Sequence, residues 1–319
     1  MSKQQLTPPS LNAKYGKVAV MFGGSSAERE VSLSSGKAVL RGLLDMGIDA
    51  HTFDPSEQPL TQLLVEKFER VVIMLHGRGG EDGSLQGALQ QLNLPYTGTG
   101  VLGSALCMDK IRSKQVWQSL GLPTANYKIA DKRSFDAGSC GAIMDDLGNE
   151  VMVKPAQEGS SIGMAKVNSA LHLEAAVQDA FKYDDKVLIE QFVHGSEYTV
   201  SILNGIALPS ISMSTPRVFY DYAAKYQSDS TVYCCPSGLS DVLEVKLGKL
   251  ALDAYEALSG SGWGRIDFMQ DTFGRFYLLE ANTVPGMTEK SLVPLAAKQS
   301  GMSFAELSLA VLETTDVHR

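Results

Sequence analysis

The chain has 319 residues, of which 44% are hydrophobic and 20% are charged, and its formal net charge is −8. A chain of this length and composition can bury one large core or two to three ordinary ones, so we expect a stable globular protein. Its negative charge argues against a nucleic-acid or anionic-membrane partner, because binding to such a partner requires clustered Lys and Arg. The charge therefore favours a small-molecule substrate.

The cysteines and the apolar segments indicate in which cellular compartment the protein is expected. Cys107, Cys140, Cys234 and Cys235 form neither a disulfide framework nor a repeated CxxC pattern, and we interpret them as reduced thiols. No apolar run approaches the ~20 residues that span a bilayer, and the first residues lack the apolar core of a signal peptide. We therefore expect a cytoplasmic protein.

A first α/β domain is predicted at residues 16–109, after a flexible polar tail at residues 1–15. Its strands, expected at 18–22, 50–53 and 71–75, alternate with helices. Strands that alternate with helices are typical of a parallel sheet.

Two glycine-rich segments follow strands of this domain. GGSSAEREVSLSSG, residues 23–36, opens a helix, and the backbone amides and dipole at such a turn can hold an anion or a carboxylate. HGRGGEDGSLQG, residues 76–87, follows the carboxyl end of a strand, where open α/β sheets bind ligands. Each signal is weak alone, and a plain strand-to-helix turn stays open for the second.

A shorter, sheet-rich segment is predicted at residues 110–190, with isolated lysines at Lys110 and Lys154. Its loop EGSSIG, residues 158–163, offers free amides and hydroxyls that could fold over phosphates, although it lacks the GK[ST] ending of a P-loop. A tight hairpin turn is the alternative. Glu190 stands in an apolar strand, where an acid must be paired or bind a ligand unless the strand lies at an exposed edge.

The last segment, residues 191–319, contains a stretch at 216–238 with no periodicity and several tyrosines. We interpret it as a long loop that covers a site as a lid, and disorder is the alternative. Helices are expected at 242–259, 290–300 and 304–312.

Residues 264–287 predict a β-hairpin with a four-residue loop at 272–275. Because side chains alternate along a strand, one face carries apolar residues that suit a core. These are Ile266, Phe268, Leu279 and Ala281.

The other face of the hairpin is polar. The predicted register sets Asp267 opposite Glu280 and Arg265 opposite Asn282. Two carboxylates and an amide oxygen, with no lysine nearby, suit Mg²⁺ or Mn²⁺ shared with substrate phosphates. A nucleotide site is therefore predicted, and an exposed edge with solvated charges is the alternative.

Taken together, these motifs resemble the ATP-grasp superfamily and, within it, the D-alanine:D-alanine ligase family, from about Lys17 to Leu312. The resemblance implies an α/β chain, α+β in its C-terminal part, with a three-domain ATP-grasp fold. It implies a Rossmann-like, biotin-carboxylase-N-like parallel sheet followed by two sheets that sandwich ATP. The motifs that carry it are the two glycine-rich segments, MDK (108–110), VKP with EGSSIGM, YDYAAKY (220–226), GRID and LLEANTVPGMT.

By this resemblance ATP is a co-substrate, used with two Mg²⁺ or Mn²⁺ ions. The metal ligands would be Asp267, Glu280 and Asn282. The groups that bind ATP would be Lys110 and Lys154 on the phosphates, Ser160 and Ser161 in the closing loop, Glu190 at the adenine amino group, Glu197 at the ribose, and Met269 and Leu279 beside the base.

The implied reaction activates one D-alanine as an acyl phosphate, which the amino group of a second D-alanine attacks. Arg265 and the Gly286 amide would stabilise the oxyanion, and Lys225 would reach the transferring phosphate. The implied substrate contacts are Glu28 on the first ammonium, linked through Ser160 to Tyr226, with His76 nearby, and Ser291 and Leu292 on the second carboxylate.

Tyr226 favours the dipeptide, since family members that make the D-alanyl-D-lactate ester tend to differ there. The resemblance also implies a role in bacterial peptidoglycan precursor synthesis and a homodimer. Another ATP-grasp ligase, or a non-catalytic sensor that retains the fold, are the alternatives.

Overall fold

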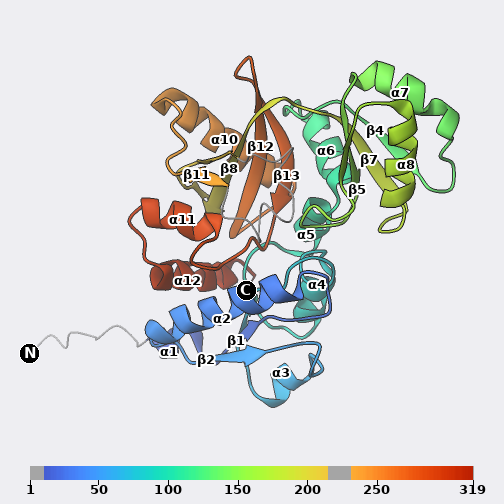
Figure 1. Ribbon diagram of the computed structural model, residues 1–319. Coiled ribbons are helices and arrows are strands. Elements are labelled where there is room, and N and C mark those ends of the chain that lie inside the picture. The colour runs from blue at the N-terminus through green and yellow to red at the C-terminus, as the bar shows by residue number, and fades with distance from the viewer. Residues whose placement is uncertain (1–10, 215–230, 319) are drawn as a thin grey trace, which may run out of the picture.

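The computed structural model describes residues 11–214 and 231–318, and three sheets organise them (Figure 1). The first sheet has the order β2-β1-β3, and all its pairs are parallel, as the alternation of strands and helices predicted. Its strands are β1 (Val18–Met21), β2 (Ala50–Phe53) and β3 (Arg70–Ile73). The helices of this part are α2 (Arg29–Asp45), α3 (Gln62–Val65), α4 (Ser84–Gln91) and α5 (Val101–Met108).

The second sheet is antiparallel, with the order β4-β7-β5-β6. Its core packs helices α7 and α8 on one face, whereas α6 lies towards the third sheet (Figure 1). Its strands are β4 (Tyr127–Asp131), β5 (Val151–Pro155), β6 (Ala165–Val167) and β7 (Lys186–Gln191). The helices are α6 (Lys110–Ser119), α7 (Cys140–Leu147), which the sequence did not predict, and α8 (Ala170–Ala180), with a 3-10 turn η1 (Ala137–Ser139).

The third sheet has the order β11-β10-β8-β12-β13, and β9 pairs with β8. Helix α10 (Asp241–Ala257) covers one face of it. The strands are β8 (Gly195–Leu203), β9 (Ile206–Ala207), β10 (Ile211–Ser214), β11 (Val232–Cys234), β12 (Trp263–Asp271) and β13 (Phe276–Asn282).

The hairpin β12–β13 confirms the predicted polar pairs, Arg265 with Asn282 and Asp267 with Glu280. Nearer the turn, Phe268 pairs with Leu278 and not with Leu279, so the register differs by one residue from the predicted one. A bulge at Leu279 connects this part of the hairpin to the part that has the predicted register. The prediction that Leu279 lies on the apolar face beside Phe268 is therefore wrong. Leu278 takes that core position, and Leu279 turns towards a cavity.

Two predicted flexible stretches are partly regular. Residues 11–15, predicted as tail, form helix α1 (Leu11–Tyr15), and the buried Tyr15 donates a hydrogen bond to Glu313 over 3.0 Å. Val232–Cys234, predicted as part of the lid loop, pairs with β10 and forms the edge strand β11. In each case a distant partner supplies the contacts that make the segment regular. Residues 215–230, with most of the predicted lid, lie outside the described residues.

The C-terminal helices return to the first sheet. Helices α11 (Leu292–Gln299) and α12 (Phe304–Glu313) share one apolar core with β1, β3 and α2, and α12 lies along α2 (Figure 1). Arg70 on β3 donates to Asp316 in the terminal turn η2 (Thr314–His318) over 2.9 Å. This packing brings the loop that follows β13 against the glycine-rich turns of the first sheet.

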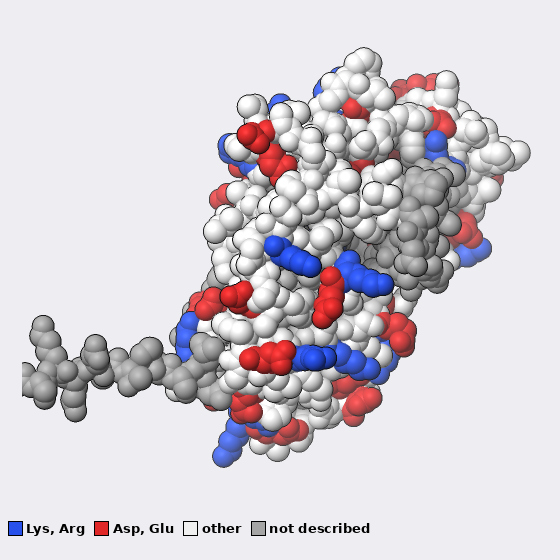
Figure 2. Space-filling model, turned by 60° about the vertical axis from the view of Figure 1, so that its left-hand side comes forward, with Lys and Arg blue, Asp and Glu red and all other residues white. Residues whose placement is uncertain are grey.

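Within the described ranges, no helix is long and apolar enough to cross a membrane. On the face that Figure 2 shows, Lys and Arg side chains are interspersed with Asp and Glu.

Candidate active site

Two cavities meet between the three sheets, and Lys110 and Glu280 line both. The Lys110 ammonium lies 3.5 Å from Glu280 Oε2. The first cavity, of about 480 Å³, is also lined by the predicted nucleotide residues Lys154, Ser161, Glu190, Glu197, Met269 and Leu279. The second, of about 430 Å³, is lined by Glu28, His76, Ser160, Arg265, Asn282, Gly286, Ser291 and Leu292.

Among the predicted residues that the structure describes, Asp267 is the one that lines neither cavity. Asp267 is 4% exposed and lies beneath the surface of the hairpin. Lys225 and Tyr226 lie outside the described residues.

Glu190 lies between two lysines on the floor of the first cavity. Strand β7 is flanked by β4 and β5, and Glu190 is 2% exposed, so the alternative of an exposed edge is wrong. Its carboxylate pairs with Lys154 and, at 2.8 Å, with the fully buried Lys114. Burial raises the pKa of Glu190, but the two ammonium groups outweigh it and bring the pKa to about 2. Glu190 is therefore ionised in the fold.

Lys114 is a member of this cluster that sequence reasoning missed. It lies one helical turn after Lys110 on α6, and its ammonium also donates to Thr124 Oγ1 over 2.5 Å. The spacing of four residues from Lys110 was the available signal, because residues i and i+4 share one face of a helix.

Glu28 lies where three segments meet in the second cavity. It precedes helix α2, and Ser160 donates a hydrogen bond to its carboxylate. Glycines make room for it, since a Cβ at Gly77 or Gly159 would lie 2.7 or 2.6 Å from Glu28 Oε2. A carboxylate held in this way presents a negative charge to a cationic group such as an ammonium.

His76 lies beside Glu28 and is 5% exposed. Its ring nitrogens lie 2.7 Å from the Val284 carbonyl oxygen and 3.2 Å from Ser35 Oγ. Burial lowers the pKa of His76, so the ring is neutral at pH 7.

Glu81 is a second residue that sequence reasoning missed. Its carboxylate accepts the backbone N–H of Gly77 over 2.7 Å and that of Val284 over 3.0 Å. It thereby joins the second glycine-rich loop to the loop after β13. Burial and the charge of Glu28 raise the pKa of Glu81 to about 8. An acid within a glycine-rich loop was the only signal.

The polar face of the hairpin contains more positive charge than the sequence argument assumed. Arg265 donates two hydrogen bonds of 2.7 Å to the Asp267 carboxylate, and Lys110 approaches Glu280, so the premise of no nearby lysine is wrong. Asp267 also accepts from Thr199 Oγ1 over 2.6 Å and from the Asn282 amide over 3.1 Å.

The oxygen donors of the hairpin fit a hard divalent cation. Asp267, Glu280 and the Asn282 side-chain oxygen are the donors available. Among the residues that the structure describes, no three His, Cys, Asp or Glu side chains gather as a metal-binding group.

The loop after β13 ends at the start of helix α11. Ser291 is the residue before α11, and its hydroxyl accepts the Thr288 N–H over 3.0 Å. A Cβ at Gly286 would lie 3.2 Å from Ser291 Oγ, so glycine permits this close approach. The Leu292 amide lies in the first turn of the helix, where backbone donors favour an anion.

The chain is similar in sequence to one group of enzymes. A family model described as "D-ala D-ala ligase C-terminus" matches residues 116–313. The D-alanine–D-alanine ligase of Pseudoalteromonas atlantica is 75% identical over 302 residues, which cover 95% of each chain. The enzyme of that name from Idiomarina loihiensis is 56% identical over 94% of this chain and 97% of its own.

A solved structure is similar as well. D-alanine–D-alanine ligase from Bacillus anthracis, complexed with ATP, matches with a TM-score of 0.82 and 30% sequence identity. The match covers 95% of this chain and 98% of that one.

Proposed function

This chain belongs to the D-alanine–D-alanine ligase family, and from this premise we infer that it joins two D-alanine molecules to D-alanyl-D-alanine with ATP, which is converted to ADP and phosphate. The product serves peptidoglycan precursor synthesis. The observation that carries this function is that two cavities share Lys110 and Glu280. One cavity suits a nucleotide and the other suits two amino acids, so transferring phosphate and substrate carboxylate meet at their junction.

The reaction has two steps, because a carboxylate is a poor electrophile until it is activated. The carboxylate of the first D-alanine attacks the γ-phosphate, and ADP leaves. The amino group of the second D-alanine then attacks the carbonyl carbon of this D-alanyl phosphate, the amine loses a proton, and phosphate leaves. The reaction needs no covalent bond to the protein.

We propose that Glu28 binds the ammonium of the first D-alanine, with the neutral His76 beside it. Arg265 and the Gly286 N–H would stabilise the oxyanion of the tetrahedral intermediate, a role that fixed donors fill well. Ser291 and the start of α11 would bind the carboxylate of the second D-alanine. Lys225 would contact the transferring phosphate.

For the nucleotide, we propose that Lys110 and Lys154 bind the phosphates as compact positive charges. Ser160 and Ser161 would close over them. Further proposed contacts are Glu190 at the adenine amino group, Glu197 at the ribose, and Met269 and Leu279 at the base. Their common place in one cavity, apart from Ser160, supports this assignment.

We propose that Asp267, Glu280 and Asn282 hold two Mg²⁺ or Mn²⁺ ions, whose charge would neutralise and orient the β- and γ-phosphates when bound. The oxygen-only donor set supports this proposal. In this structure Arg265 pairs with the Asp267 carboxylate. When the metal ions bind, this guanidinium would turn away from Asp267 and donate to the oxyanion.

We also propose a cytoplasmic homodimer that needs no nucleic acid or membrane. Its three domains would be residues 16–109, 110–190 and 191–319, with a lid at 216–238. Resemblance to the family supports the homodimer.

The test is phosphate release from Mg·ATP with D-alanine, with L-alanine, and with D-lactate plus D-alanine, with the products identified by mass. We expect release with D-alanine and the dipeptide as product. Preferential use of D-lactate would keep the ligase class and contradict the argument from Tyr226. No turnover in any arm would contradict the function and point to another ATP-grasp ligase or a sensor.

A further inference from the structure

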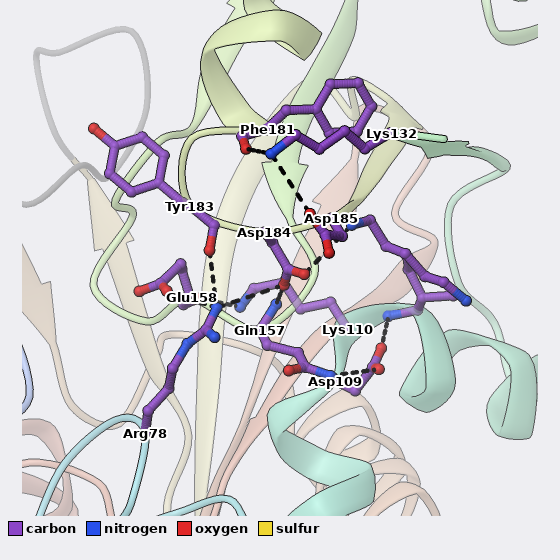
Figure 3. A network of polar contacts seen from close by, with 12 residues as sticks. Arg78, Asp109, Lys110, Lys132, Gln157, Glu158, Phe181, Tyr183, Asp184 and Asp185 are labelled. Carbon is purple, nitrogen blue, oxygen red and sulfur yellow. Dashed lines mark hydrogen bonds and ion pairs between the residues drawn. The ribbon is translucent and has the colours of Figure 1, made fainter. Parts of the chain in front are cut away.

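Arg78, in the second glycine-rich segment, reaches loops that connect the elements of the second sheet (Figure 3). Its Nη2 donates to the Tyr183 carbonyl oxygen over 3.0 Å and lies 2.8 Å from Glu158 Oε1. The same atom lies 3.7 Å from Asp184 Oδ2. One guanidinium thus contacts three groups of the central segment, two of them carboxylates.

Those groups hold the start of the loop EGSSIG, residues 158–163, which we call the Gly/Ser loop. Asp184 also accepts the backbone N–H of Gln157 over 2.9 Å, and the Glu158 carbonyl accepts from Lys110 Nζ over 2.6 Å. The Gln157 side chain donates to Asp109 over 3.1 Å. Figure 3 shows these contacts as one continuous network. A displacement of Arg78 would therefore change the contacts that hold residues 157 and 158, where the loop begins.

The loop itself needs to be held. Ser160 and Ser161 have φ values of +50° and +61°, in the left-handed region that costs free energy for residues other than glycine. Such a conformation persists only where surrounding contacts offset its cost. Ser160 contacts Glu28, in the second cavity, whereas Ser161 lines the first.

Arg78 lines neither of these cavities. We propose that Arg78 is a positioning residue, an interdomain latch that holds the Gly/Ser loop closed over the nucleotide and the first amino acid together. This rests on the proposed function. Its pair with Glu158 is partly solvated, since the Arg78 side chain is 48% exposed, so the latch is sensitive to salt.

The test is the variant Arg78→Ala. Loss of the latch raises the KM for ATP and the KM for the first D-alanine together, each by about fivefold at low ionic strength, while kcat changes little. The reacting groups are untouched, and only the closed population of the loop falls. The difference from wild type shrinks in 1 M NaCl, and Arg78→Lys, which keeps the charge, recovers part of the loss.

Lys132→Ala is the matched control. Lys132 donates to the Phe181 carbonyl over 2.9 Å and lies 3.5 Å from Asp185, near the same turn but within the central segment (Figure 3). It makes no contact across the domains in this network, so both KM values stay at the wild-type level. Glu158→Gln, which weakens one of the three contacts of Arg78, should raise both KM values by less than Arg78→Ala does, and the double variant should raise them little more than Arg78→Ala alone.

A second readout does not depend on turnover. Hydrogen exchange of the backbone amides in 158–164, measured without substrates, becomes faster in Arg78→Ala than in wild type or Lys132→Ala. Unchanged exchange with unchanged KM values in Arg78→Ala overturns the latch. If wild type fails to turn over D-alanine, the proposed function fails, and the exchange comparison still tests the latch by itself.

Discussion

Ser160 donates its hydroxyl hydrogen to the carboxylate of Glu28, although 132 positions separate the two residues in the chain. Ser160 lies in the loop beside the nucleotide cavity, and Glu28 lies at the first glycine-rich turn. One hydrogen bond therefore joins the part that would bind phosphates to the part that would bind the first amino acid. We therefore expect that binding of either substrate to the closed loop would favour binding of the other.

Ser160→Ala should weaken binding of the first D-alanine. A hydrogen bond to a charged group contributes about 1.5 kcal/mol, so its loss should raise the KM for D-alanine about tenfold. The measurement is initial-rate kinetics with each substrate varied. Ser161→Ala is the comparison, because Ser161 lines the nucleotide cavity and not the second one, so it should raise the KM for ATP more than the KM for D-alanine. Equal effects of the two variants on D-alanine would contradict the assignment.

Lys114→Met should lower stability and weaken ATP binding. Its removal leaves Glu190 with Lys154 as the one remaining ammonium partner of the cluster, and breaking such a buried cluster costs about 3 kcal/mol. Lys154 is then held more tightly by Glu190 and is less available to phosphate, so the KM for ATP rises. Urea unfolding and kinetics measure both effects. Lys128→Met, which removes an exposed pair with Asp146, should change stability by less than about 0.5 kcal/mol.

Glu280→Ala should abolish turnover. It removes a proposed metal ligand and the partner of Lys110 at the junction of the cavities. We expect at least about a hundredfold loss of kcat, the scale of an electrostatic group in the transition state. Phosphate release with saturating Mg·ATP measures it. Glu256→Ala, at an exposed position on α10, should keep full activity. Near-normal turnover of Glu280→Ala would show that the hairpin is not the metal site.

Asp54→Asn should reduce the loss of folding free energy that occurs as the pH falls below about 5. Burial raises the pKa of Asp54, but hydrogen bonds from Arg29, Gly24 and Ser56 outweigh it and lower the pKa to about 2. A carboxyl group with a depressed folded pKa stabilises the fold above its unfolded pKa and loses this contribution as pH falls from about 4 to about 2.

The lowering of the Asp54 pKa corresponds to about 2 kcal/mol of folding free energy at neutral pH. Wild type should therefore lose about 2 kcal/mol more than Asp54→Asn between pH 5 and pH 2, measured by urea unfolding at each pH. Parallel curves would show that this carboxylate has no linked role at the first glycine-rich turn.

The sequence by itself determined the local elements and the hairpin pairs of the site. Strand alternation placed Asp267 opposite Glu280, and the glycine-rich turns marked the carboxyl ends of parallel strands. Such patterns follow from backbone geometry over a few residues, so they can be predicted without knowledge of distant contacts.

Tertiary structure alone decided the partners of these groups. The burial of Lys114 beside Glu190 and the reach of Arg78 to Glu158 depend on segments far apart in the chain, and the bulge at Leu279 accompanies the burial of Leu278 in the core. Local sequence does not encode which charges will meet, because the free energy of a buried or bridging charge depends on whatever the fold packs against it.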